Sequence, residues 1–136
     1  MASLKVGEVA RQAGVNLQTV HYYERRGLLP KPPRTASNYR AYPVDAVLRV
    51  HFIKRAQELG FTLKEIQELL SLRAAPRARC GDVRGRAEAK VRDIDEKIRT
   101  LQAMRRALTK LVAECSGSGS VSECPIMEAL DSENER

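Results

Sequence analysis

The run DVRGRAEAKVRDIDEKIRTLQAMRRALTKLVAEC, from Asp82 to Cys115, decides the fold of this chain. Apolar residues recur in it at alternating intervals of four and three, which is the pattern of a coiled-coil seam. On a heptad repeat the d positions are Ala87, Ile94, Leu101, Leu108 and Cys115, and the a positions are Val91, Ile98, Arg105 and Val112. No proline interrupts the run, so the spacing predicts one long helix over 82–115. Such a helix needs a partner to bury its seam.

Cysteines mark the two ends of this run, because Cys80 precedes it and Cys115 closes it. The two cysteines are 35 positions apart, which is about 50 Å along a helix that rises about 1.5 Å per residue. Two thiolates that share one metal ion must each lie about 2.3 Å from it. A continuous helix therefore cannot bring both cysteines of one chain to one ion. Two chains paired in antiparallel orientation would place Cys80 of one chain near Cys115 of the other.

A third cysteine, Cys124, follows across the flexible segment Ser116-Gly117-Ser118-Gly119-Ser120, which can fold back towards Cys115. We therefore expect two metal sites in a homodimer, each formed by Cys80, Cys115 and Cys124 drawn from both chains. Thiolates are soft ligands that select soft or borderline ions. Three of them satisfy Hg(II), whereas zinc normally takes four ligands in a tetrahedron. The chemistry of the three thiolates therefore favours Hg(II) as the bound ion.

Other readings of the cysteines stay open. Lead or cadmium could occupy a three-thiolate site, and the thiols could instead form a redox sensor. Carboxylates near the cysteines could complete a weak zinc or cadmium site; they are Asp82, Glu114 and Glu123. A cytosolic metal carrier is a further alternative that the basic N-terminal half argues against.

The N-terminal segment is predicted to form two short helices, over 5–13 and 18–26, on either side of Gly14. Asn16 is a favourable N-cap for the second helix, and Gly27 is a favourable C-terminal stop. Two helices joined by a short glycine turn are typical of a helix-turn-helix motif. The second helix would offer side chains that can bond base edges or phosphates in a major groove. These candidates are Gln18, Thr19, His21, Tyr22 and Arg25.

The segment over 28–42 changes character, because its three prolines exclude a regular helix. It predicts a short hairpin or wing, with Asn38 in the left-handed turn conformation. Arg34 and Arg40 would bind phosphates beside the groove. The wing candidates for DNA contact are Arg34, Asn38, Tyr39 and Arg40.

Two more helices are predicted before the long one. Pro43 is expected to open a helix that Gly60 ends, and Thr62 with Glu65 forms the capping box of the next helix. The predicted fold is all-α with a small β wing. It comprises a winged helix-turn-helix domain over 1–75, a hinge over 76–81, an antiparallel coiled-coil dimerisation helix over 82–115, and a metal-binding loop with a short C-terminal helix over 116–136.

Composition supports a nucleic-acid partner. Residues 1–75 carry 12 Lys and Arg against 6 Asp and Glu, while residues 76–136 carry 12 against 11. The basic excess thus lies where the helix-turn-helix is predicted. No run is apolar enough for a membrane span, and no export signal is evident, so we expect a cytoplasmic protein with reduced thiols and no membrane partner. Nothing in the sequence indicates an enzyme.

Three segments resemble the MerR family of transcription regulators: TVHYYERRGLLP at 19–30, NYRAY at 38–42 and LGFTLKEI at 59–66. The resemblance covers essentially the whole chain. Cysteine spacings of 35 and 9, followed by Cys124-Pro125-Ile126, resemble those of the mercuric-ion sensors of the family. Lead and cadmium sensors of the family can carry similar cysteine triads.

The resemblance implies a homodimer that binds promoter double-stranded DNA between two promoter elements of a metal-resistance operon. Without metal the dimer would hold RNA polymerase unproductively and repress. With metal it would distort the DNA so that the polymerase can use both elements. Two residues depart from the family pattern, because His21 stands where arginine is usual and Asn38 where glycine is usual. The first departure weakens the transfer of a phosphate contact to that position.

Overall fold

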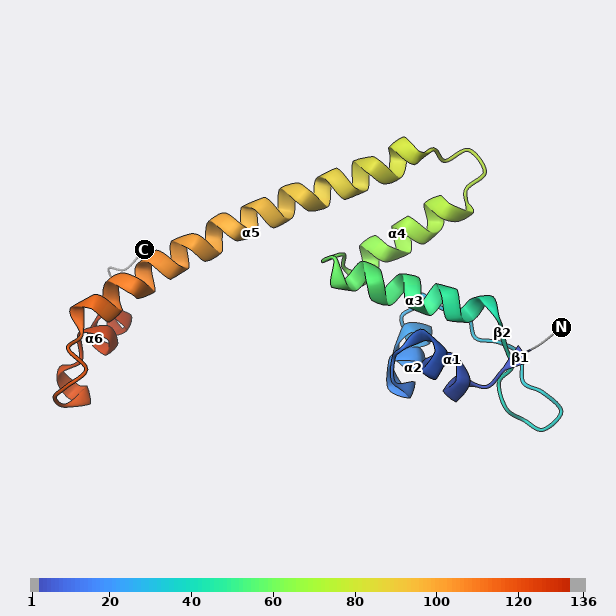
Figure 1. Cartoon of the computed structure of the whole chain (residues 1–136), viewed down its shortest axis with the longest axis horizontal. Helices are drawn as coiled ribbons and strands as arrows, with labels where there is room; N and C mark the ends of the chain where they lie inside the picture. The colour runs from blue at the N-terminus through green and yellow to red at the C-terminus, as the bar shows by residue number, and fades with distance from the viewer. Residues whose placement is uncertain (1–2, 133–136) are drawn as a thin grey trace. The chain divides into compact units, whose positions relative to one another are not determined.

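A glycine turn separates the first two helices in the computed structural model, which describes residues 3–132 (Figure 1). Helix α1 spans Val6–Ala13 and helix α2 spans Leu17–Arg25. Gly14 ends α1 in the left-handed conformation, with φ of 75°. Asn16 then caps α2, because its side chain accepts a hydrogen bond from the Thr19 amide at 2.8 Å. Both turn signals read from the sequence are confirmed.

The predicted wing is a hairpin at the edge of a very small sheet. Strand β1 (Ser3–Leu4) pairs antiparallel with strand β2 (Tyr42–Pro43), so that Leu4 lies opposite Tyr42. Within the hairpin, Arg34 and Arg40 form an isolated antiparallel bridge. Asn38 takes the left-handed turn conformation with φ of 64°, as predicted.

Pro43 does not open the third helix, which corrects the prediction from sequence. It lies in β2, and helix α3 spans Asp45–Glu58. Proline is tolerated at both helix starts and strand edges because neither position uses its missing N–H. Pro43 lies in a strand because β2 pairs with β1. The sequence did not predict this pairing, since β1 is a short strand without a local sequence signal.

Helix α4 spans Leu63–Ala74 and begins with the predicted capping box. Thr62 Oγ1 accepts a hydrogen bond from the Glu65 amide at 3.1 Å, and Glu65 Oε1 accepts one from the Thr62 amide at 2.8 Å. Helices α1 to α4 and β2 enclose one apolar core. Its fully buried side chains include Val9, Val20, Leu28, Tyr42, Val50, Ile53 and Ile66.

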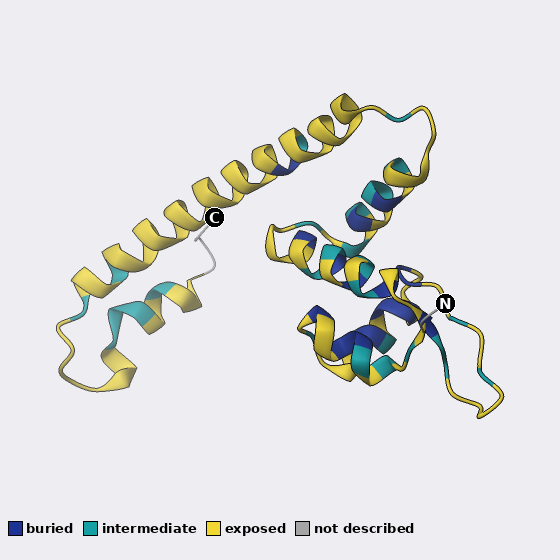
Figure 2. Ribbon diagram, turned by 45° about the vertical axis from the view of Figure 1, so that its right-hand side comes forward, coloured by how far each residue is buried: buried dark blue, intermediate teal, exposed yellow. Residues whose placement is uncertain are grey.

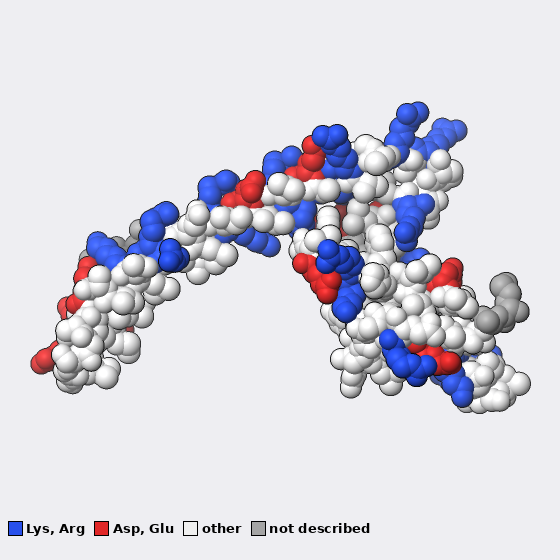
Figure 3. All heavy atoms as spheres, in the orientation of Figure 1, with Lys and Arg blue, Asp and Glu red and all other residues white. Residues whose placement is uncertain are grey.

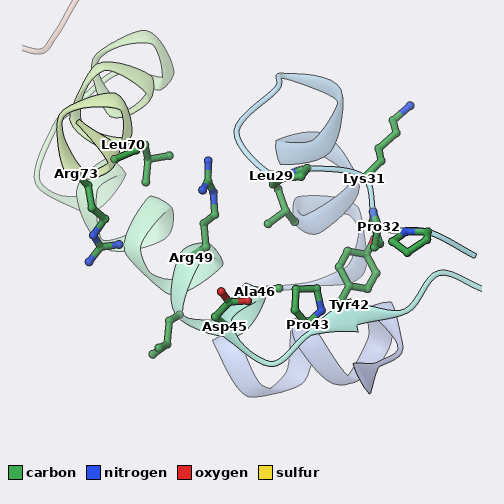
Figure 4. A pocket seen from close by; sticks show the side chains of 14 residues that line it. Leu29, Lys31, Pro32, Tyr42, Pro43, Asp45, Ala46, Arg49, Leu70 and Arg73 are labelled. Carbon is green, nitrogen blue, oxygen red and sulfur yellow. The ribbon is translucent and has the colours of Figure 1, made fainter. Parts of the chain in front are cut away.

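A cavity of about 630 Å³ lies where the proline-rich segment meets α3 and α4 (Figure 4). Leu29 and Tyr42 form part of its wall, and Arg49 and Arg73 reach it from α3 and α4. The Arg49 Nε–H also donates a hydrogen bond to the Leu28 carbonyl at 2.8 Å. This bond ties α3 to the segment that leaves the helix-turn-helix.

Helix α5 is one unbroken helix of 35 residues, Cys80–Glu114 (Figure 1). It begins two residues before the predicted start, because the Asp82 carboxylate accepts a hydrogen bond from the Arg79 amide at 2.9 Å and so caps the helix earlier. The chain divides into two compact units within this helix, after Lys90. Charged side chains of both signs recur along α5 on the face shown in Figure 3.

The predicted seam lies open along α5 (Figure 2). Leu101 is 60% exposed and Val112 is 63% exposed. The other large apolar residues of the seam that are exposed are Val91, Ile94, Ile98 and Leu108. A single chain therefore leaves this apolar stripe in contact with water, which is unfavourable by about 25 cal/mol per Å².

The C-terminal segment folds into two short turns of helix, η1 (Val121–Glu123) and α6 (Pro125–Asp131). Pro125 occupies the first turn of α6, where its missing N–H has no helical partner to lose. Residues 133–136 of the predicted C-terminal segment lie outside the described residues. Between Ser3 and Ser132, no helix has the length and apolar content that crossing a bilayer would require.

Candidate DNA interface and cysteine site

The outer face of α2 presents most of the predicted DNA-contacting side chains. Gln18, Tyr22 and Arg25 are exposed, and Thr19 and His21 are half-buried. The Thr19 hydroxyl is already engaged, because it donates a hydrogen bond to Asn16 Oδ1 at 2.9 Å. Thr19 therefore helps to cap α2 as well as lying on its exposed side.

Tyr22 lies between two arginines at the end of α2. The guanidinium carbons of Arg25 and Arg26 are each 5.7 Å from the centre of its ring, and Arg26 Nη1 donates a hydrogen bond to the Tyr22 hydroxyl at 2.8 Å. An aromatic ring flanked by two cations is a suitable surface for a phosphate backbone. Sequence reasoning missed Arg26, although its spacing of four residues from Tyr22 on a helix predicts such a contact.

The side chain of Glu24 connects α2 to the wing. Its carboxylate is 1% exposed and accepts hydrogen bonds from Arg40 Nη1 at 3.0 and 3.1 Å and from the Tyr42 hydroxyl at 2.9 Å. His21 Nδ1 lies 3.2 Å from the same carboxylate. Burial, together with the bond to Glu24, raises the pKa of the Tyr42 hydroxyl. Sequence reasoning missed Glu24, because its partners lie 16 and 18 residues away.

Arg40 forms an ion pair within the protein, which the predicted phosphate contact did not include. Its half-buried guanidinium pairs with Glu24, so a phosphate would have to bind the donors that Glu24 leaves free. Arg34 and Asn38 are exposed on the wing, and Arg34 Nη1 donates to the Asn38 carbonyl at 3.1 Å. Tyr39 is also exposed, and the Lys5 ammonium lies 4.7 Å from the centre of its ring. The wing contacts remain a prediction.

Replacing Glu24 with glutamine is expected to lower the free energy of unfolding by about 2 kcal/mol, because a buried charged acceptor with several donors would be lost. Promoter binding should weaken as well, since the wing would no longer be fixed on α2. Urea unfolding measures the first effect and a DNA titration the second. Glu88→Gln is the matched control: Glu88 pairs with Arg84 at 3.5 Å on the surface, and its loss should change stability by less than about 0.5 kcal/mol. Equal effects of the two substitutions would contradict this role of Glu24.

Two of the three predicted metal ligands lie together at the C-terminal end of the chain. Cys115 directly follows α5, Cys124 is the N-cap of α6, and the two thiols lie close together. The backbone amides of Met127 and Ile126 also point to this sulfur, and these bonds lower the pKa of the Cys124 thiol. Both thiols are reduced. Thiolate character favours metal binding.

Cys80 is the exposed first residue of α5. Within residues 3–132 of the chain, no three side chains of His, Cys, Asp or Glu lie close enough to hold a metal ion. The structure thus joins Cys115 to Cys124 and does not form a three-cysteine group. The donor set nevertheless fits a soft metal ion, because two sulfurs are adjacent and one of them is stabilised as thiolate.

A glycine turn between α1 and α2, an exposed face with cations and a tyrosine, and a wing fixed to that face by a buried acid define a winged helix-turn-helix protein. The sequence matches the model of the MerR helix-turn-helix family of regulatory proteins over residues 4–72 and the MerR DNA-binding model over residues 47–111. The chain belongs to the MerR family of DNA-binding transcription regulators.

Relatives that match along nearly the whole chain carry names that refer to metals. A mercuric resistance operon regulatory protein of Bacillus cereus is 45% identical over 93% of this chain and 96% of its own length. A transcription regulator from Ralstonia metallidurans CH34 in complex with lead(II) is 35% identical, with a TM-score of 0.82 over 93% of this chain and 98% of its own. A MerR regulator from Bacillus megaterium MB1 in complex with mercury(II) is 41% identical, with a TM-score of 0.71 and the same coverage.

Proposed function

We propose that this protein is a Hg(II)-responsive transcription regulator of a mercury-resistance operon. The observation that carries the proposal is the closeness of Cys115 and Cys124 at one end of an unbroken 35-residue helix whose first residue is Cys80. The 45% identity to a mercuric resistance regulator and the 41% identity to a mercury-bound relative support Hg(II) as the effector.

The metal site is proposed to be shared between two chains. Helix α5 is about 50 Å long at about 1.5 Å per residue, and its apolar seam is open in the single chain. An antiparallel homodimer would bury the seam and bring Cys80 of each chain to Cys115 and Cys124 of the other. Each dimer would then hold two sites, and a bound Hg(II) would supply a strong bond to each sulfur.

We assign the parts of the chain to this function as follows. Residues 1–75 would bind promoter DNA, 76–81 would act as a hinge, 82–115 would pair the two chains, and 116–136 would hold the metal. In the DNA-binding part the proposed contacts come from α2 and the wing, at Gln18, Thr19, His21, Tyr22, Arg25, Arg34, Asn38, Tyr39 and Arg40.

The switch follows from a difference in metal affinity between two arrangements of the dimer. Because Cys80 begins the helix that follows one DNA-binding unit, and Cys115 ends the helix of the other chain, bonding them would favour one placement of the two DNA-binding units. Distorting a promoter spacer costs on the order of 1–6 kcal/mol. Metal–thiolate binding free energies of about 10 kcal/mol or more are sufficient to drive it. The metal-free dimer would repress, and the metal-bound dimer would let RNA polymerase use both promoter elements.

Lead(II) is the second candidate effector, because the lead-bound relative has the TM-score of 0.82. Cadmium and a thiol redox sensor are further alternatives; the closeness of Cys115 and Cys124 would allow the latter. Titrating the reduced dimer with Hg(II), Pb(II) and Cd(II), with a competing thiol present, decides among the metals. We expect Hg(II) to bind at one ion per chain with thiolate-to-metal absorption and to induce transcription at the lowest concentration. Induction by peroxide without metal would instead support the redox sensor.

Mixing two inactive variants tests the shared site. Chains with Cys80→Ser and chains with Cys115→Ser each lack a ligand in both sites of their own homodimers. In the mixed dimer, one site would draw all its cysteines from unaltered positions, so half of the metal binding should return. Stoichiometry of Hg(II) in the isolated heterodimer measures this. A site built within one chain predicts no recovery, and such a result would overturn the antiparallel arrangement.

A further inference from the structure

Lys90 is buried in the first unit, which is unusual for a lysine. It is 6% exposed, and its Nζ lies 2.8 Å from Glu65 Oε1. The ammonium is also 5.7 Å from the centre of the Phe61 ring, and the side chain passes close to Gly60. One side chain on α5 thus reaches the corner where α3 ends and α4 begins.

Glu65, the partner of Lys90, also accepts a hydrogen bond from the backbone. Glu65 Oε1 accepts both the Lys90 ammonium and the Thr62 amide that opens α4. Lys90 foremost, followed by the Thr62 amide, lowers the pKa of Glu65 to about 2. Glu65 therefore stays ionised throughout the neutral range. Through this carboxylate, Lys90 binds α5 to the capping box of α4.

A second ion pair joins the same two helices one turn earlier on α5. Arg86 Nη1 lies 2.9 Å from Glu68 Oε1, and both side chains are partly exposed. Arg86 and Lys90 are four residues apart on one helix, and Glu68 and Glu65 are three apart on the other, so each pair shares a helix face. The two bonds hold the first three turns of α5 on α4.

We infer that Lys90 is a positioning residue that makes the start of α5 move as one body with the DNA-binding unit. A displacement of α5 would then displace this unit and change the conformation of the bound DNA. This inference rests on the proposed function. Ion pairs with a buried partner, here Lys90, seldom add more stability than apolar side chains of similar volume, but they fix a geometry. Without the pair, the start of α5 would be held on α4 less firmly, and a displacement of the helix would be transmitted less completely to α1 and α2.

The test compares Lys90→Met with Lys97→Met, which removes a lysine from the same heptad position one repeat later, where the side chain is exposed. Lys90→Met should bind the promoter without metal within about threefold of the unaltered protein and keep its Hg(II) stoichiometry. Its metal-induced transcription should fall by about tenfold or more, because coupling between two sites typically changes affinity by about this factor. Lys90→Arg should retain induction, because it keeps the charge at Glu65.

A metal-independent measurement separates this inference from the proposed function. Backbone amides of 81–90 should exchange hydrogen about tenfold faster in Lys90→Met than in Lys97→Met, while those of α1 to α3 remain unchanged. If the unaltered protein does not respond to metal, the proposed function fails and the exchange comparison still decides the role of Lys90. Should Lys90→Met not fold, Glu65→Gln takes its place, since its amide oxygen can still accept from Thr62. Normal induction with unchanged exchange overturns the inference.

Discussion

Replacing Cys124 with serine is expected to abolish transcription at the Hg(II) concentration that induces the unaltered protein, while promoter binding stays intact. If a metal–thiolate site supplies about 10–16 kcal/mol from its ligands together, the loss of one thiolate of three costs about 3–5 kcal/mol. That loss raises the metal concentration needed for induction by about a hundredfold or more. Cys80→Ser and Cys115→Ser should behave alike, because each removes one sulfur from both sites. Transcription measured against Hg(II) concentration, with DNA binding measured in parallel, checks the expectation.

Val121→Ala is a suitable control for these variants. Val121 is 72% exposed in the same loop and has no ligand atom, so induction should be unchanged. The three-cysteine hypothesis is wrong if all three serine variants still induce at the normal Hg(II) concentration. Loss of promoter binding in a serine variant would show instead that the cysteine supports the fold.

Replacing Leu101 with lysine is expected to separate the two chains of the proposed dimer. Each leucine side chain buried in a seam contributes about 2 kcal/mol, and the dimer loses two of them. The dimer dissociation constant should therefore rise by about a thousandfold, with a further penalty for burying the new ammonium groups. Sedimentation of the purified protein at micromolar concentration measures this change. DNA binding and metal binding should weaken together, since both would require the dimer.

Thr100→Lys is the matched control, because it places the same charge one residue away, at a position outside the heptad seam. It should leave the dimer unaffected, since a lysine there can stay in water. A Leu101→Lys protein that sediments like the unaltered chain would rule out the seam as the pairing surface.

Features set by neighbouring residues could be predicted from the sequence. The turns at Gly14 and Asn38, the Asn16 cap and the Thr62–Glu65 capping box need only a few adjacent residues, and the structure confirms them. The long helix was also evident, because the periodic seam extends over many residues. Its start was placed two residues late, because Asp82 was taken as the first helical residue, whereas its carboxylate accepts a hydrogen bond from the Arg79 amide and so caps the helix from within its first turn.

Features set by distant partners could not be predicted in this way. Glu24 and Lys90 look like surface residues in the sequence, yet both are buried because their partners come from other elements. Pro43 was assigned to a helix because its strand partner, Ser3, lies forty residues earlier. In the candidate metal site, the closeness of Cys115 and Cys124 could be predicted, because a short flexible loop joins them. The proposed contribution of Cys80 would depend on a second chain, which the sequence of one chain does not show.

The amides of Met127 and Ile126 at the Cys124 sulfur also affect how the protein would capture an ion from acidified surroundings. A thiol must give up its hydrogen before it can coordinate, so protons compete with metals for sulfur. Because these amides lower the pKa of Cys124, its sulfur would keep a thiolate to lower pH than a thiol without such neighbours. Metal uptake at this sulfur would therefore persist to lower pH.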